Sequence, residues 1–154
     1  MSEDRETINV YNAKADDYAG AFSEAAGSKA LRRFMEKLGE GASVLDLGCG
    51  PGAHAAALHA NGFKVTAMDA SAAMVDKARA HKGITVQQAG FADLDALGAY
   101  DGIWANFSLL HAARADFPVF LSRIAAALKP GGIFHIGMKT GEGEHRDALG
   151  RFYT

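Results

Sequence analysis

Short apolar runs alternate with stretches of helical spacing along this chain. Runs with little polar alternation predict strands at 43–47, 64–68, 84–86, 102–105 and 133–138. Apolar residues at helical spacing, bounded by glycine-rich stops, predict helices at 7–22, 28–38, 53–60, 71–81 and 116–128. Apolar strands separated by helices of about ten residues are typical of a parallel sheet covered on both faces. With right-handed crossovers, the pattern predicts an α/β, doubly wound, Rossmann-like sheet of about five strands.

Composition and charge narrow the class of protein. The 154 residues suffice for one domain, and sixteen basic against eighteen acidic side chains leave a formal net charge of −2. That balance offers no broad basic surface for nucleic acid. A single cysteine, Cys49, excludes an internal disulfide and a cysteine-based metal site, and we expect no bound metal. No apolar run reaches a membrane span and residues 1–6 contain no signal-peptide core, so we expect a cytoplasmic protein without membrane contact.

The residues that follow the predicted strands carry the candidate chemistry, since ligands of such sheets bind beyond the carboxyl ends of the strands. After the first strand, Gly48, Gly50 and Gly52 stand at alternate positions, where they let the backbone lie against a ligand. This glycine turn has a structural interpretation, a tight strand-to-helix turn that binds nothing. It also satisfies the looser G-x-G-x-x-G/A form of a dinucleotide site.

Carboxylates around the glycine turn favour a different ligand. Asp46 precedes the turn, Asp69 ends the second strand, Asp93 follows the third, and Asp101 opens the fourth. Acids at the turn disfavour a pyrophosphate, and the turn contains no lysine or arginine to offset them. An acid at the end of the second strand is suited to accept both hydroxyls of a ribose. S-adenosylmethionine combines positive charge with one ribose, so it fits these acids better than a dinucleotide does.

Five segments of the chain resemble, in order and spacing, the motifs of class I S-adenosylmethionine-dependent methyltransferases of the small bacterial type. They are 44–52 with the glycine turn, 65–71 with Asp69, 90–94 with Asp93, 100–106, and 128–132 before the last strand. The resemblance implies a single methyltransferase domain over residues 1–154. In that domain, residues 1–40 would form an N-terminal helical lid, 41–138 the cofactor-binding core and 139–154 a polar tail.

The resemblance also implies roles for individual residues. The glycine turn would lie against the methionine part and ribose of the cofactor, with Asp46 at its amino end and Asp69 on the ribose hydroxyls. Phe91 or Ala92 would flank the adenine and Asp93 would accept from its amino group, while the Ala105 carbonyl and Asn106 would line the methyl-bearing side. The candidate cofactor residues are therefore Tyr11, Tyr18, Asp46, Gly48, Cys49, Gly50, Gly52, Asp69, Ala70, Phe91, Ala92, Asp93, Ala105 and Asn106.

Three of the candidate residues have a plausible alternative role. Tyr11 and Tyr18 resemble the N-terminal helix that covers the cofactor in small bacterial members, but aromatic residues at helical spacing also pack against each other. His111, five residues after Asn106, is the candidate general base because an imidazole titrates near neutral pH. The alternative is that His111 orients a loop or stacks on the acceptor without moving a proton.

The acceptor of the methyl group is expected to be a small molecule. Family members that methylate nucleobase amino groups often carry an Asn/Asp-Pro-Pro-aromatic motif after the fourth strand, where this chain has Ala105-Asn106-Phe107-Ser108. The leading interpretation is therefore a small-molecule methyltransferase. The alternatives are a non-catalytic S-adenosylmethionine-binding module or truncated enzyme, and an NAD-dependent oxidoreductase.

The chain length leads to one more expectation. The family's sheet usually has seven strands, and the residues after 138 leave no room for the sixth and seventh. We therefore expect a shortened sheet whose fifth strand is an exposed edge, and homo-oligomers formed through that edge.

Overall fold

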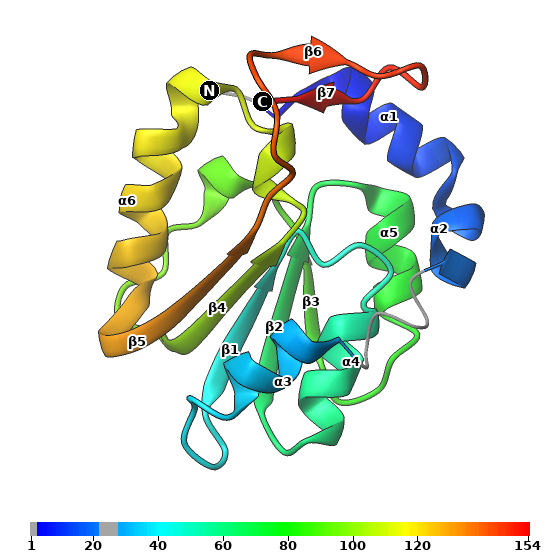
Figure 1. Ribbon diagram of the computed structural model, residues 1–154. Coiled ribbons are helices and arrows are strands. Elements are labelled where there is room, and N and C mark those ends of the chain that lie inside the picture. Colours follow the sequence, from blue (N-terminus) through cyan, green and yellow to red (C-terminus); the bar gives the residue numbers. More distant parts are fainter. Residues whose placement is uncertain (1–2, 22–27) are drawn as a thin grey trace.

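A five-stranded parallel sheet organises the computed structural model, which describes residues 3–21 and 28–154. The strands are β1 (Ser43–Leu47), β2 (Lys64–Asp69), β3 (Thr85–Gln88), β4 (Tyr100–Asn106) and β5 (Leu128–Gly137). Their order is β3-β2-β1-β4-β5, so the chain winds outward from β1 in both directions (Figure 1). This order confirms the predicted α/β, doubly wound, Rossmann-like sheet of five strands.

Six helices are described: α1 (Arg5–Ala13), α2 (Ala15–Ala21), α3 (Lys29–Met35), α4 (Ala53–Ala60), α5 (Ala72–Ala78) and α6 (Phe117–Ala127). Short 3₁₀ turns lie at Phe91–Asp93, Leu109–His111 and Arg114–Asp116. Local caps fix two starts, because Ser28 Oγ accepts from the Leu31 amide and Ser71 Oγ from the Met74 amide. In residues 3–21 and 28–154, no helix has the length and apolar content to cross a membrane.

The two faces of the sheet carry separate apolar clusters. On one face, Val44 and Trp104 pack with side chains of α3 and α4, among them Leu31 and Leu58. On the other face, Leu45 and Ile103 pack with Phe120 and Ile124 of α6. Neighbouring strand residues thus point to opposite buried faces, which explains why the strands read as continuous apolar runs.

The N-terminal residues divide between the pocket side and the core. The segment predicted as one helix at 7–22 forms two helices, because the helical conformation is interrupted at Lys14 between α1 and α2. Phe22 lies outside the described residues. The lid expected over residues 1–40 stays a prediction, and within this range α3 buries Leu31 and Phe34 in the core cluster at 0% and 3% exposure.

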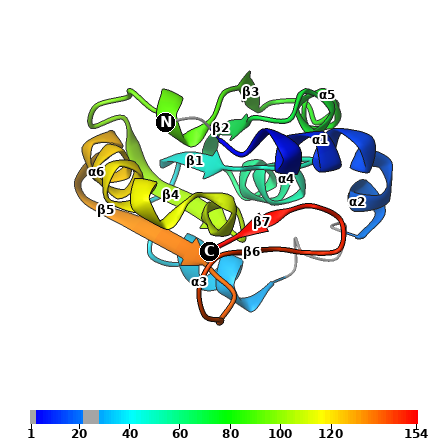
Figure 2. The same ribbon diagram turned by 90° about the horizontal axis from the view of Figure 1, so that it is seen from above.

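Residues 139–154, expected as a polar tail, contain a second, small sheet. Strands β6 (His145–Arg146) and β7 (Phe152–Tyr153) form an antiparallel hairpin separate from the main sheet. The Phe152 amide donates to Thr7 Oγ1 at 2.7 Å, and Tyr153 is 7% exposed. Seen from above, the hairpin lies beside α1 across the carboxyl end of the sheet (Figure 2).

Strand β5 begins earlier than predicted, because Leu128 already pairs with Tyr100. The register then shifts, and regular pairing resumes at Gly102 with Ile133, the residue at which the sequence predicts the strand to start. The glycine-rich segment 129–132 is therefore a bulged lead into the strand.

Candidate functional site

A pocket lies at the carboxyl ends of β1, β2 and β4, and residues of α1 form part of its lining. Ten predicted site residues line it: Tyr11, Asp46, Gly48, Cys49, Gly50, Asp69, Ala70, Phe91, Asn106 and His111. Its carboxylates come from Glu3, Asp4, Asp46 and Asp69, and among its described lining residues there is neither lysine nor arginine. Such a lining favours a positively charged ligand over a pyrophosphate.

The glycine turn is shaped by close backbone packing. Gly48 has φ 76°, and a Cβ there would lie 2.2 Å from the Cβ of Ser108. The amides of Gly48 and Cys49 both donate to the Met68 carbonyl, at 2.8 and 2.9 Å. Gly50 has φ 54° and no atom within 4 Å of the place a Cβ would take. The turn therefore leaves free space at Gly50 for an approaching ligand.

Asp46 is the most confined carboxylate of the site. It is 2% exposed, and within the described part of the chain its Oδ2 has no hydrogen-bond partner. Burial, followed by the nearby charge of Asp69, raises its pKa to about 7 although the Ala55 amide opposes the shift. A buried carboxylate oxygen without a partner is costly, and a cationic donor in the pocket would relieve it.

Asp69 is held by the backbone at the end of β2. Its Oδ2 accepts from the Gly50 amide at 2.8 Å and its Oδ1 from the Ser71 amide at 2.9 Å. Burial raises the pKa of this carboxyl, and the two amides oppose the rise. The same carboxylate thus orients the glycine turn and the start of α5, and each oxygen keeps a further lone pair for a hydroxyl donor.

His111 and Tyr11 are brought into direct contact, 100 residues apart in sequence. The Tyr11 hydroxyl lies 2.6 Å from His111 Nε2, and His111 Nδ1 lies 2.6 Å from the Phe152 carbonyl oxygen. Because a carbonyl only accepts, Nδ1 carries a proton and donates it. Burial lowers the pKa of His111, so near neutral pH its ring is uncharged and Nε2 accepts from the Tyr11 hydroxyl.

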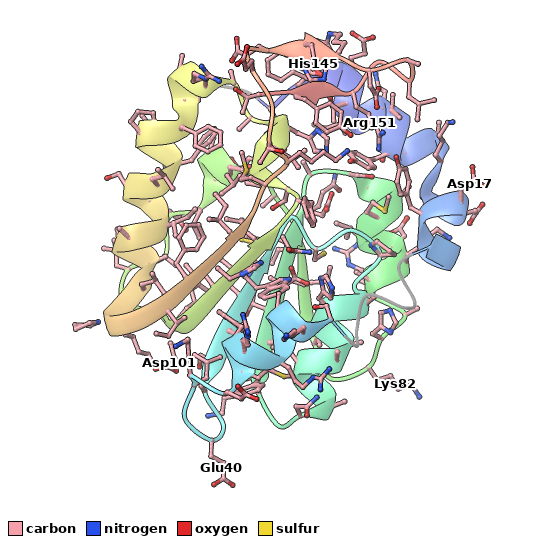
Figure 3. The ribbon with its side chains drawn as sticks, viewed as in Figure 1. Asp17, Glu40, Lys82, Asp101, His145 and Arg151 are labelled. Carbon is pink, nitrogen blue, oxygen red and sulfur yellow. The ribbon has the colours of Figure 1, made fainter. Side chains whose placement is uncertain are left out.

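Tyr18 lies beside the pocket rather than in its lining. Its ring centroid is 5.0 Å from that of Tyr11, and its hydroxyl accepts from Arg151. Arg151 also donates to Asp147 Oδ2 from Nε at 2.8 Å, and it lies beneath the hairpin (Figure 3). The two tyrosines therefore pack together, as in the alternative given from sequence, while Tyr11 also lines the pocket.

Four further predicted residues do not line this pocket. Gly52 packs against α5, where a Cβ would lie 3.0 Å from that of Ala78. Ala105 is fully buried in the core of β4. Ala92 and Asp93 line a neighbouring depression, and Asp93 Oδ2 accepts from the Gly90 amide at 2.8 Å. Their predicted contacts with the cofactor stay predictions.

Asp101 was also expected among the carboxylates around the site, but it does not line the pocket. Its Oδ2 accepts from the Ser43 amide at 2.8 Å and from Lys129 Nζ at 3.0 Å. Because it opens β4 instead of ending it, it lies at the opposite end of the sheet from Arg151 (Figure 3). It joins neighbouring strands and takes no part in the pocket.

Sequence reasoning missed several residues of the pocket. Glu3 lines it, accepts from the Phe91 amide, and has a pKa raised by burial to about 7. Ser108 Oγ donates to the Leu47 carbonyl at 2.7 Å and closes the turn at Gly48. Neither residue belongs to a motif that sequence reasoning assigned to the cofactor. Asn12, outside the pocket lining, accepts at Oδ1 from Ser71 Oγ at 2.6 Å and joins α1 to α5.

The donor set fits S-adenosylmethionine. The unpartnered Oδ2 of Asp46 suits an ammonium donor, and the free space at Gly50 admits a ligand against the backbone. The remaining lone pairs of Asp69 suit ribose hydroxyls. Residues 3–21 and 28–154 contain no group of three or more His, Cys, Asp or Glu side chains that could hold a metal ion.

Comparisons with known proteins agree with this fit. Residues 44–132 match the family described as "Methyltransferase domain". The chain is 35% identical over 98 residues to the cypemycin N-terminal methyltransferase of a Streptomyces species, covering 60% of this chain and 40% of that protein. The chain spans about two fifths of the length of the curated relatives it matches.

Two solved structures extend the similarity to the whole fold. The 1,6-didemethyltoxoflavin-N1-methyltransferase of Burkholderia thailandensis was solved with 1,6-didemethyltoxoflavin and S-adenosylhomocysteine bound. It superposes with a TM-score of 0.78 at 26% identity, over 99% of this chain and 73% of that one. A TehB-like S-adenosylmethionine-dependent methyltransferase from Corynebacterium glutamicum gives a TM-score of 0.73 at 25% identity, over 84% of this chain and 74% of that one.

Proposed function

The chain belongs to the methyltransferase domain family, whose cofactor is S-adenosylmethionine, and we propose that it transfers a methyl group to a small-molecule acceptor. The observation that carries the proposal is the buried, unpartnered Oδ2 of Asp46 on the wall of a pocket without lysine or arginine in its described lining. The relatives add support, since the Burkholderia enzyme was solved with 1,6-didemethyltoxoflavin bound.

When bound, S-adenosylmethionine supplies a methyl group activated by a positively charged sulfur. The chain's own residues then have to position the reactants and exclude water. Asp46 holds the amino end and Asp69 the ribose, while residues of α1 line the pocket and the β6–β7 hairpin packs against α1. The role of each predicted cofactor residue is part of this proposal.

We further propose that an acceptor proton leaves through Tyr11 and His111. The acceptor passes its proton to the Tyr11 oxygen, and the Tyr11 proton moves to His111 Nε2, 2.6 Å away. His111 Nδ1 keeps its proton and its hydrogen bond to the Phe152 carbonyl throughout. His111 therefore acts through Tyr11, which lines the pocket beside it.

The pH dependence of turnover tests this relay. Because burial places the pKa of His111 below its usual 6.5, turnover should rise with pH through that lower value and stay level above it. Tyr11→Phe removes the hydroxyl of the relay and keeps the ring that lines the pocket, so it should lower kcat much more than cofactor affinity. An unchanged kcat in Tyr11→Phe, with the same pH profile, would contradict the relay.

A combined binding and turnover experiment tests the main proposal. Titration calorimetry measures S-adenosylmethionine binding, and a screen of small-molecule acceptors follows formation of S-adenosylhomocysteine. Binding with turnover on at least one acceptor supports the enzyme. Binding without turnover on any acceptor favours the binding-module alternative, and absence of binding removes both.

We also propose that the protein acts without nucleic acid and that copies of the chain associate along the outer edge of β5. The near-balanced charge supports the first statement. The position of β5 at the end of the strand order supports the second.

A further inference from the structure

Phe107 has an unusual backbone conformation at the pocket wall. With φ 53°, it is the one non-glycine residue with positive φ among the described residues. This left-handed region is unfavourable for a bulky side chain. Phe107 nevertheless directly follows β4 and lines the pocket.

Contacts with β1 and β5 hold this conformation in place. The Phe107 amide donates to the Gly137 carbonyl of β5 at 3.0 Å. The next residue, Ser108, anchors to the Leu47 carbonyl of β1 through its hydroxyl. At Gly137, a Cβ would lie 2.4 Å from Asn106 Oδ1. The absence of a side chain at Gly137 therefore allows β5 to pack closely against the residues that end β4. Strained residues persist where their surroundings fix them, and they concentrate at functional sites.

The Phe107 side chain gains little from packing in return for this strain. The residue is 49% exposed and belongs to neither apolar core cluster of the sheet. An aromatic ring that is strained, half exposed and on a pocket wall is available to a ligand.

The position of Phe107 separates it from the groups assigned to the cofactor. The acids Asp46 and Asp69 end β1 and β2, whereas Phe107 follows β4, on the other side of β1 in the strand order. The β4 side of the pocket carries the neutral side chains of Asn106 and Ser108, together with His111 in hydrogen-bond contact with Tyr11. A flat uncharged ring matches this side better than a charged or aliphatic acceptor.

We propose that Phe107 is the surface on which the acceptor stacks, and that the acceptor is a planar aromatic or heteroaromatic compound. This inference rests on the proposed methyl transfer for its place in the reaction. It predicts binding of planar rings whether or not turnover follows.

The decisive variant is Phe107→Asn, because asparagine tolerates the left-handed region and removes the ring. Ligand-observed NMR with S-adenosylhomocysteine present would measure binding of planar phenols and heteroaromatic amines, beside aliphatic alcohols and amines of equal size. We expect wild type to bind planar compounds preferentially, and Phe107→Asn to weaken that binding about tenfold. Phe107→Tyr keeps an aromatic ring and should bind planar compounds as wild type does. Leu97→Asn changes an exposed apolar residue outside the pocket and should also leave this binding unchanged.

Stability separates this proposal from a purely structural role of the ring. If the ring supported the fold, Phe107→Asn would melt below wild type, whereas relief of strain predicts an equal or higher melting temperature. No preference of wild type for planar compounds, or equal binding by Phe107→Asn, would overturn the proposal. Planar binding without methyl transfer would leave it standing and refute the proposed function instead.

Discussion

Asp46 and Asp69 end neighbouring parallel strands, and their closeness has an energetic consequence that the sequence does not display. The register pairs Asp46 with Ala67 and Leu47 with Met68, so both acids reach the same pocket. Their positions were predictable because strand ends and the glycine turn are visible in the pattern. Their ionisation was not, because it depends on burial, which only the packed fold determines.

Because of Asp46, the protein should become less stable as pH rises. Its pKa is about 7 when folded and near 3.8 when unfolded, so between these values the native state keeps a proton that the unfolded chain loses. The free energy of unfolding therefore decreases as pH rises through this window. Without ligand, Asp46→Asn should be more stable than wild type at pH 8 by about 1–3 kcal/mol, and the gain should vanish near pH 4. Urea unfolding at both pH values measures it.

The same variant should lose the cofactor. A charge-assisted hydrogen bond to the ammonium is worth roughly 10- to 100-fold in Kd, and Asp46→Asn should weaken S-adenosylmethionine binding by that factor. Wild-type affinity should increase from pH 5.5 to 7.5 as Asp46 ionises, while the variant's stays level. Calorimetry that finds equal affinities at pH 7.5 would contradict the assigned role of Asp46.

Gly50 and Gly41 form a matched pair for the glycine turn. Both have positive φ, 54° and 67°, and neither has an atom within 4 Å of the place a Cβ would take. Alanine should therefore cost about 1–2 kcal/mol of stability at either position. Only Gly50 lines the pocket, so only Gly50→Ala should weaken S-adenosylmethionine binding, by tenfold or more. Equal loss of affinity in both variants would mean that backbone strain, and not the occupied space, matters.

At the scale of elements, the strands that could be predicted from the sequence are those buried on both faces. Strands β1, β2 and β4 were predictable because both faces are buried, which makes each an apolar run. The hairpin was not, because β6 and β7 have two residues each and no periodicity. Its stability comes from distant partners, such as Thr7 for Phe152 and Asp4 for Arg146. The hairpin is thus held against α1 by contacts between residues far apart in the sequence.

Asp4 has two roles that substitutions can separate: it caps α1 and it pairs with Arg146 of the hairpin. It accepts from the Thr7 amide as the N-cap of α1 and pairs with Arg146 at 2.6 and 2.9 Å. Asp4→Asn keeps the cap and loses the ion pair, so it should cost at most about 1 kcal/mol, and Arg146→Ala should also have only a small effect. Asp4→Ala loses both, which should add about 1 kcal/mol. Thermal unfolding measures the differences, and hydrogen exchange should show faster exchange in the hairpin.

Acid should release this contact only at low pH. The hydrogen bond from Arg146 lowers the pKa of Asp4 to about 2, so its contribution is present above about pH 4 and is lost as pH falls through 2. A double-mutant cycle of Asp4→Asn with Arg146→Ala should be non-additive. Additive effects would show that the pair contributes nothing to docking of the hairpin.

At the scale of the whole molecule, the sheet has unequal ends. β3 has four residues, whereas β5 has ten and no described strand pairs with its outer edge. The hairpin that follows β5 forms its own two-stranded sheet against α1, so it does not extend this edge. A long unpaired edge strand exposes hydrogen-bonding groups to another chain, and proteins commonly blunt such edges with charge.

We therefore expect concentration-dependent self-association in sedimentation velocity, driven by the β5 edge. Ile136 of β5 is 38% exposed, and Ile136→Lys places a charge on this strand, which should shift the protein toward monomer. Leu97→Lys is the matched control, because Leu97 is 79% exposed and lies outside β5, so an effect of added charge alone would appear there too. S-adenosylmethionine affinity should be the same in all three proteins, since neither residue lines the pocket. A wild type that remains monomeric at all concentrations, or equal dissociation by both variants, would rule out association through this edge.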